Sequence, residues 1–330
     1  MNFIGDDDFG RDPMTGFMQG LSRSPDAATT FFNETKPQDN AQWVLKDRPV
    51  FDDSPLNDDD GNLSREATGK ALFAATTGMD PNDPHAPLQP HTAANRHALD
   101  RSLKYLSETG DDFPPETRDD MAKALVNYGD EYHYSASSQH SGDDDPRMLD
   151  RNQLMEVSKQ ISRSQHAYGL LNEGINHEIV GDLYNDHPKD PRETLYRAGA
   201  TVGFLEEARY EAMDTDKEDP SWKAKWGYHL VGGALNFIPG VGDAAQRGVD
   251  AAAYAWQEDE QARIDGKQED ENRKVFGARE QQLSVFAKQW AEANPDGMKR
   301  YGYNEYTVED DINAHAFDGN DRVKGLGGKH

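Results

Sequence analysis

Apolar side chains recur every three or four residues along most of this chain, the spacing that places them on one face of a helix. Leu99, Leu103 and Leu106 follow this spacing in one segment, and the same pattern returns in others. Runs that alternate apolar and polar residues, which would predict strands, are nearly absent. The pattern therefore predicts an all-α fold, with helices near residues 13–21, 25–33, 64–77, 92–109, 115–128, 151–162, 165–184, 191–208 and 306–317.

Residues that start and stop helices bound these segments. Asp150 and Ser164 stand where an N-cap side chain is needed, and Pro191 suits a first helical position. Gly78 is placed to end a helix, because glycine accepts the left-handed backbone found there. The connecting segments are acidic and rich in Pro, Asn and Asp, so we expect long solvated loops, such as residues 34–62.

Composition divides the chain into three parts. Residues 1–11 are acidic and predict a flexible arm, and residues 319–330 predict a flexible tail. Between them, residues 12–318 predict one helical domain. A run rich in Ser and Asp at 135–149 is the best candidate for a soft division within that domain.

The least polar stretch, residues 221–262, organises the predicted domain. Residues 226–242 contain no Asp, Glu, Lys or Arg. Pro239 and Gly240 interrupt the stretch, because proline lacks the N–H that a continuous helix needs and glycine accepts reversed backbone angles. We therefore predict a multi-helix bundle around a central apolar helical hairpin. The residues that define this hairpin are Trp222, Trp226, Leu230, Phe237, Ile238, Pro239, Gly240, Gly242 and Trp256.

Three interpretations of this hairpin are open from the sequence. The favoured one is a buried core, since its glycines permit close helix approach and its aromatic side chains fill the surrounding space. Insertion of residues 226–256 into a membrane is the second. An uncharged arm of about 17 residues is at the lower limit for a span, and His229 and Asn236 oppose insertion. Docking to a partner helix is the third.

Charge and cysteine usage narrow the function classes. The chain of 330 residues carries 35 Lys and Arg against 61 Asp and Glu, a formal net charge of −26. Such a charge repels nucleic-acid backbones and anionic membrane surfaces, so we expect no nucleic-acid partner and regard membrane contact as the less favoured alternative. Cysteine is absent, which excludes disulfides, thiolate catalysis and Cys-based metal sites.

The first residues also bear on location. They lack the basic region and the following apolar region of a Sec signal peptide. No run reaches the ~18 apolar residues of a conventional transmembrane helix. We therefore expect a cytoplasmic protein, or one exported by a non-Sec route.

No segment carries a complete catalytic or cofactor-binding motif. His177 and Glu178 begin the His-Glu-x-x-His pattern of zinc proteases, but Gly181 stands where the second histidine is needed. The acidic run at 57–62 fails the spacing of an EF-hand loop. We therefore assign no catalytic, cofactor-binding or metal-binding residue and favour a non-enzyme. A hydrolase whose carboxylates converge only in three dimensions is retained as an alternative.

Several segments of this chain share features with the corresponding segments of a known group of proteins. The features are Asp12-Pro13 with a helix start at 24–32, residues 121–128 followed by Glu131 and His133, residues 150–154 leading into 166–168, and residues 232–256. Together they resemble an uncharacterised actinobacterial family associated with type VII (ESX-type) secretion and polymorphic-toxin loci. The phrase at 237–244 also resembles the pre-toxin linker of bacterial polymorphic toxins.

This resemblance implies a helical, secretion-associated protein and supplies no catalytic residues. The Tyr-x-x-x-Glu spacing of Tyr254 and Glu258 also resembles a type VII export signal. We therefore expect a non-enzymatic scaffold, carrier or interaction protein whose partners are other proteins, secretion components among them. A membrane-active protein that inserts the hairpin, and an unrecognised hydrolase, are the alternatives.

Overall fold

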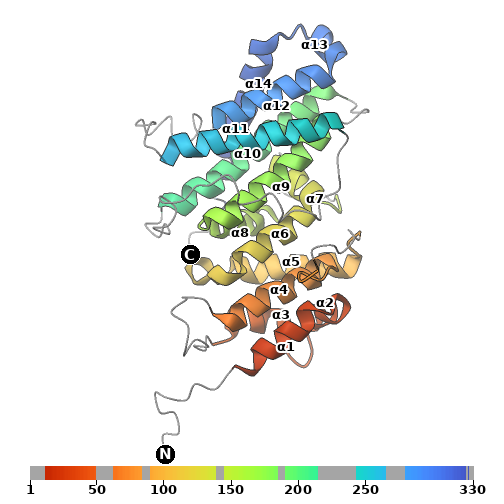
Figure 1. The fold of residues 1–330 in the computed structure, drawn as a ribbon, viewed down its shortest axis with the longest axis vertical. Coiled ribbons are helices and arrows are strands. Elements are labelled where there is room, and N and C mark those ends of the chain that lie inside the picture. The colour runs from red at the N-terminus through yellow and green to blue at the C-terminus, as the bar shows by residue number, and fades with distance from the viewer. Residues whose placement is uncertain are drawn as a thin grey trace, which may run out of the picture. The chain divides into compact units, whose positions relative to one another are not determined.

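The computed structural model describes residues 12–49, 62–83, 90–138, 145–184, 190–214, 243–264, 279–324 and 326. Helices joined by turns make up this described part (Figure 1). No strand occurs in it, so the all-α prediction is confirmed.

The chain forms two compact units, Met1–Asn127 and Tyr128–His330. The division falls before the 135–149 run at which the sequence suggested a soft boundary. Helix α7 (Gly129–Ser137) explains the difference, because it includes the start of that run and packs against helices that come later in the chain. The sequence predicted one helical domain with a candidate soft division at 135–149, and the packing of the chain divides it between Asn127 and Tyr128.

Six α-helices and three shorter turns make up the described part of the first unit. They are α1 (Pro13–Ser22), α2 (Pro25–Asn33), α3 (Asn40–Gln42), the π-helical turn η1 (Trp43–Asp47), α4 (Leu63–Thr77), α5 (Ala93–Ser107), the 3₁₀ turns η2 (Gly110–Asp112) and η3 (Pro115–Thr117), and α6 (Arg118–Asn127).

Helix α4 is the centre of the first unit, and α1, α2, α5 and α6 all pack against it. Small side chains let these neighbours approach from several sides. Asn62 caps α4 by accepting a hydrogen bond from the Arg65 backbone N–H at 3.0 Å. Gly78 ends it in the left-handed conformation, at a φ of 72°. The buried small residues of α4 include Ala67, Ala71, Ala74 and Ala75.

Helical turns occupy part of the 34–62 stretch that the sequence predicted as a loop. Asp39 precedes α3 and η1, and its carboxylate accepts a hydrogen bond from the Gln42 N–H at 2.8 Å. The same carboxylate accepts hydrogen bonds from Arg101 and Tyr105 of α5, which are 62 and 66 residues away in sequence. Long-range contacts therefore order a segment whose composition favours a loop.

Eight α-helices make up the described part of the second unit. They are α7 (Gly129–Ser137), α8 (Arg151–Ile161), α9 (Gln165–Leu183), α10 (Pro191–Asp214), α11 (Asp243–Ile264), α12 (Glu280–Ala293), α13 (Pro295–Tyr301) and α14 (Glu305–Val323).

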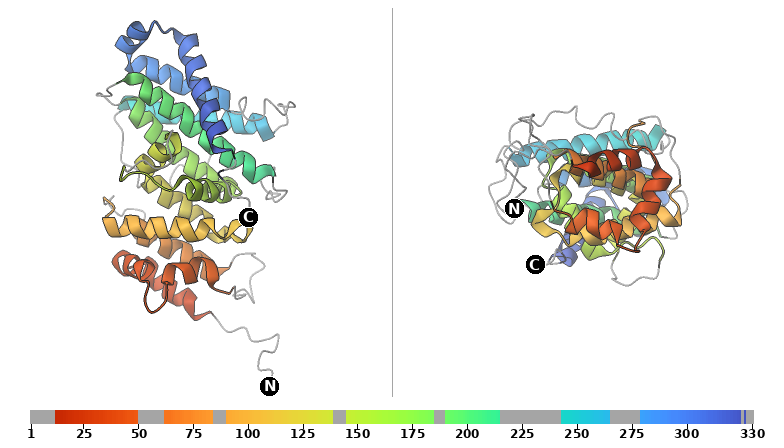
Figure 2. Two further views of the ribbon diagram at one scale, coloured as in Figure 1. Left: turned by 180° about the vertical axis from the view of Figure 1, so that it is seen from behind. Right: turned by 90° about the horizontal axis from the view of Figure 1, so that it is seen from below.

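Helices α10 and α14 pack with their backbones in close approach (Figure 2). A Cβ atom on Gly199 would lie 2.6 Å from the carbonyl oxygen of Ile312, and one on Gly319 would lie 2.5 Å from that of Ala200. Gly203 is equally close to the α14 backbone. Contacting residue numbers rise together on the two helices, so the helices run in the same direction.

The flexible tail predicted at 319–330 begins too early. Helix α14 extends to Val323, and Gly319, Asn320 and Val323 are buried. The Asn320 side chain donates a hydrogen bond to Glu207 of α10 at 2.7 Å. Glycine and the polar residues around it suggested the end of the helix, but contact with α10 stabilises its last turn.

Among the residues that define the predicted hairpin, Trp256 alone lies in the described part of the chain. It is 3% exposed on α11, and its ring packs edge-on against Tyr168 of α9, with ring centroids 5.8 Å apart. The other hairpin residues, from Trp222 to Gly242, lie outside the described residues. The central hairpin therefore stays a prediction.

A transmembrane helix must be both long and apolar. None of the described helices combines the length and the apolar character that a membrane crossing requires.

Candidate functional site

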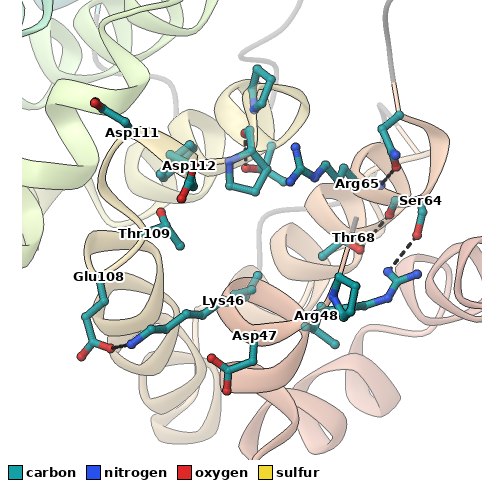
Figure 3. Close-up of a pocket in the computed structure, with 18 of the residues that line it drawn as sticks. Lys46, Asp47, Arg48, Ser64, Arg65, Thr68, Glu108, Thr109, Asp111 and Asp112 are labelled. Atoms are coloured by element: carbon teal, nitrogen blue, oxygen red, sulfur yellow. Dashed lines mark hydrogen bonds and ion pairs between the residues drawn. The ribbon is translucent and has the colours of Figure 1, made fainter. Parts of the chain in front are cut away.

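A cleft in the first unit has a volume of about 630 Å³ and brings together three segments that lie apart in sequence. The turn η1 forms one wall, the start of α4 forms the second, and residues 108–117 form the third (Figure 3). Pro49, Pro114 and Pro115 add apolar surface to its mostly polar lining.

Two of the three cations in this cleft are neutralised by acids of the same unit. Lys46 crosses to Glu108, with Nζ 2.7 Å from the carboxylate oxygen (Figure 3). Arg48 forms an ion pair with Asp12, and its Nη1 donates a hydrogen bond to the Ser64 hydroxyl at 2.9 Å. The Arg48 and Asp12 side chains are nearly buried, so this pair holds the cleft floor in place.

The third cation, Arg65, differs from the other two. Within the described part of the chain, its guanidinium has no hydrogen bond or ion pair. It stands in the first turn of α4, where the positive end of the helix dipole also favours an anion. Arg65 therefore provides an open anchor for a carboxylate.

The wall opposite these cations is acidic. Glu108, Asp111 and Asp112 line it, and the Thr109 hydroxyl lies among them (Figure 3). A ligand that fits this cleft must bring a negative group to Arg65 and polar or positive groups to the other wall. A peptide segment has both kinds of group.

The second unit contains a smaller cavity of about 320 Å³. Helices α7, α9 and α10 supply most of its lining, and one residue comes from the turn before α8. The lining residues are Asp130, His133, Tyr134, Arg147, Glu178, Gly181, Asp182 and Arg197.

Both ring nitrogens of His133 are engaged by the protein. Nε2 lies 3.3 Å from Asp182, and Nδ1 lies 2.8 Å from the hydroxyl of Thr201, which is buried. A carboxylate only accepts, so Nε2–H donates to Asp182, and the Thr201 hydroxyl occupies Nδ1. His133 is itself buried, and this geometry holds it away from a substrate.

Asp182 is likewise neutralised by its neighbours. Arg197 donates to it through Nε at 2.8 Å and through Nη2 at 2.6 Å. Burial alone would raise the pKa of Asp182, but the hydrogen bonds and charges of His133 and Arg197 outweigh it and lower the pKa to about 2. Asp182 is therefore an anion at neutral pH, and it positions the Arg197 guanidinium and the His133 ring.

Glu178 lies one helical turn before Asp182, on the same face of α9. Burial, with a smaller contribution from the charges of Asp130, Glu131 and Asp182, raises the pKa of Glu178 to about 7. No hydrogen bond or ion pair joins its carboxyl group to another described residue. It is the one lining acid of this cavity that the surrounding residues leave without a counter-charge.

The structure separates the residues that the sequence singled out. Tyr254 and Glu258 lie together on the exposed side of α11, where the Tyr254 hydroxyl donates to Glu258 at 2.7 Å. His177 is buried, and burial lowers its pKa. The acidic run at 57–62 is outside the described residues except for Asn62. No cluster of three His, Cys, Asp or Glu side chains able to hold a metal ion occurs in the described part.

The sequence alone did not identify the charged residues that line the two cavities. Glu178 was noticed only as part of an incomplete zinc motif, and Asp182 and Arg197 were not noticed at all. The signal available was a pair of acids at positions i and i+4 of one helix. Their partners on α7 and α10 follow only from the tertiary structure.

No family model, curated protein or solved structure matches this chain. The case for a function therefore comes from the geometry of the two cavities and from the sequence resemblance.

Proposed function

We propose that this protein is a non-enzymatic, all-helical interaction protein that works with type VII secretion or polymorphic-toxin systems. Its partner is another protein, and the cleft of the first unit holds a segment of that partner. Arg65 binds a carboxylate of the segment, and the acidic wall binds its polar or basic groups.

The observation that carries this proposal is the open guanidinium of Arg65 in a cleft of about 630 Å³. In a chain with a net charge of −26, acids to pair with an arginine are abundant. Lys46 and Arg48 in the same cleft have found such partners. An arginine left open in this setting supports recognition of an external anion.

The second unit supports a non-enzymatic role. The residues that most resemble a catalytic group bind one another: Asp182 accepts hydrogen bonds from His133 and Arg197. The Thr201 hydroxyl occupies the remaining ring nitrogen of His133. A general base needs a free nitrogen within hydrogen-bond reach of its substrate. His133 has none available in this arrangement.

Titration with a defined peptide tests the proposal. The probe is a tripeptide amide with a central glutamate, followed by NMR of the full chain. We expect shifts at the start of α4 and at 108–117, and an affinity about tenfold lower for Arg65→Gln, because a charge-assisted hydrogen bond is lost. Arg23→Gln is the matched control, since Arg23 is exposed at the end of α1 and outside the cleft. Equal binding by Arg65→Gln and the wild type contradicts the proposal.

The link to secretion is tested separately at α11. Tyr254 and Glu258 are exposed, so Tyr254→Ala and Glu258→Gln leave the core intact. In a host with an active type VII system, we expect less protein in the medium for each variant at an unchanged cellular level. Unchanged export of both variants removes the export-signal hypothesis.

One observation favours the hydrolase alternative. Glu178 and Asp182 lie in one cavity, and their pKa values are about 7 and about 2. Environments that separate two carboxyl groups in this way are typical of acid–base pairs. Turnover of a peptidoglycan, nucleotide or ester substrate that is abolished by Glu178→Gln would replace the non-enzymatic proposal.

A further inference from the structure

We propose that the cavity of the second unit is a binding site for an organic cation, with Glu178 as its anionic anchor. The ligand is a guanidinium or ammonium group on a short aliphatic chain. The site is independent of the cleft in the first unit, because none of its residues belongs to that cleft.

Among the acids that line the cavity, one has no counter-charge among the described residues. Arg197 neutralises Asp182, and His133 also binds it. Asp130 is largely exposed and lies 3.7 Å from Arg147. Glu178 is half-buried and has no ion pair or hydrogen bond to any described residue. A cation that enters the cavity therefore meets an unneutralised carboxyl group.

The lining of the cavity already includes one bound guanidinium group, that of Arg147. Its Cζ atom lies 4.1 Å from the centroid of the Tyr134 ring, and its amine nitrogens pair with Asp145 at 3.1 Å and Asp130 at 3.7 Å. An aromatic face beside carboxylates is the arrangement that recognises guanidinium and ammonium groups. Arg147 is 45% exposed, so a ligand can displace it or bind beside it.

The backbone makes room for the Glu178 side chain. A Cβ atom at Gly129 of α7 would collide with Cγ of Glu178, so a side chain at that position would push the carboxyl group aside. The groups around Glu178 are acids from α7 and α9, namely Asp130, Glu131 and Asp182, with His133, Arg147 and Arg197 farther along the lining. A bound cation relieves the repulsion among the acids.

The size of the cavity sets the size of the ligand. About 320 Å³ lies at the lower end of small-molecule sites, which suits a group as large as one basic side chain. Gly181 lines the cavity, and a Cβ atom there would meet nothing within 4 Å. A larger side chain at Gly181 would therefore start in open space beside the cavity.

Calorimetric titration of the full chain at pH 8 tests the site with two probes. Ethylguanidinium represents a free small molecule, and acetyl-Gly-Arg-Gly-amide represents a basic side chain of a partner protein. We expect at least one probe to bind the wild type, and about tenfold weaker binding by Glu178→Gln. Glu173→Gln is the matched control, because Glu173 is also half-buried on α9 but does not line the cavity. Its affinity should equal that of the wild type.

Two further variants separate binding from folding. Gly181→Leu should abolish binding while the melting temperature does not fall, since leucine is the better helix former and the space is open. Arg147→Ala should bind ethylguanidinium several-fold more tightly, because the internal guanidinium no longer competes. Binding should weaken as the pH falls below 7, where Glu178 gains a proton.

The outcomes are distinct. Binding of the peptide alone supports the site and identifies a protein side chain as the ligand, and binding of ethylguanidinium alone identifies a free small molecule. Absence of binding by both probes overturns the proposal. So does an equal loss of affinity in Glu178→Gln and Glu173→Gln, or undiminished binding by Gly181→Leu.

Discussion

Two charged clusters in the second unit differ in how completely their charges are paired. In the first, Arg279 is 1% exposed and forms an ion pair with Glu206 of α10. Its Nη2 also donates to the Tyr168 hydroxyl at 3.1 Å, and its guanidinium lies over Trp256 at 5.5 Å. The second cluster lines the cavity formed by α7, α9 and α10. His133 and Arg197 bind Asp182 there, and Glu178 has no ion pair with any described residue.

The difference separates structural charge from functional charge. The Arg279 cluster pairs Arg279 with Glu206 in the interior, and it joins α9, α10, α11 and the start of α12 around one guanidinium. Buried charges need such complete pairing, because an unpaired one loses its hydration without compensation. The Glu178 cavity keeps one group unpaired beside open space, where a ligand can reach it. The three predictions below test this contrast, starting with the largest effect.

Loss of the Arg279–Glu206 ion pair should lower the free energy of unfolding more than the other changes proposed here. Arg279→Met leaves Glu206 buried without its counter-charge, and we expect a loss of about 3–5 kcal/mol in the free energy of unfolding of the second unit. Hydrogen exchange at the backbone amides of α12 measures it without interference from the first unit. The double variant Arg279→Met with Glu206→Leu removes both charges and should recover most of the loss. A single variant as stable as the wild type contradicts the structural role of this pair.

Breaking the incomplete cluster should cost less. Asp182→Asn deprives Arg197 and His133 of their shared carboxylate, and we expect a loss of about 1–2 kcal/mol. Arg197 is 28% exposed and can turn to water, which limits the penalty. Thermal unfolding and hydrogen exchange at α9 measure the change. A loss as large as that of Arg279→Met would show that the two clusters are equally structural.

The pH dependence of stability sharpens the same contrast. Burial, aided by the charge of Asp250, raises the pKa of Glu173 to about 7, and Glu178 behaves in the same way. The folded unit therefore keeps protons that the unfolded chain loses from the ordinary value of 4.5 upward, and stability falls as the pH rises from there to about 7. We expect about 1 kcal/mol for each group after allowance for solvent.

Single variants show how much each glutamate contributes to the fall of stability with rising pH. Glu178→Gln and Glu173→Gln should each make the decline between pH 5 and pH 7 shallower than in the wild type. At low pH the direction reverses, because the pKa of Asp182 is about 2 and its stabilising contribution is lost as the pH falls below 3.8. A stability curve that is flat from pH 5 to pH 7 in the wild type would contradict the raised pKa values.

Local sequence signals predicted much of the helical framework. Asp150 caps α8 by accepting hydrogen bonds from the backbone N–H groups of Asn152 and Gln153, and Ser164 caps α9. Gly78 ends α4 as expected. These signals are reliable because a cap or a stop depends on residues within one helical turn. The apolar stripe of Leu99, Leu103 and Leu106 is buried, as its helical spacing predicted.

The sequence by itself therefore determined an all-α protein, the starts and ends of most described helices, and its acidic character. The tertiary structure alone decided that the chain forms two units, that α14 continues along α10, and that Arg65 and Glu178 are left open. The physical reason is distance along the chain. A helix boundary depends on neighbours in sequence. Whether a polar or charged side chain is paired depends on residues from other helices, and Thr201, which binds His133, lies 68 residues beyond it.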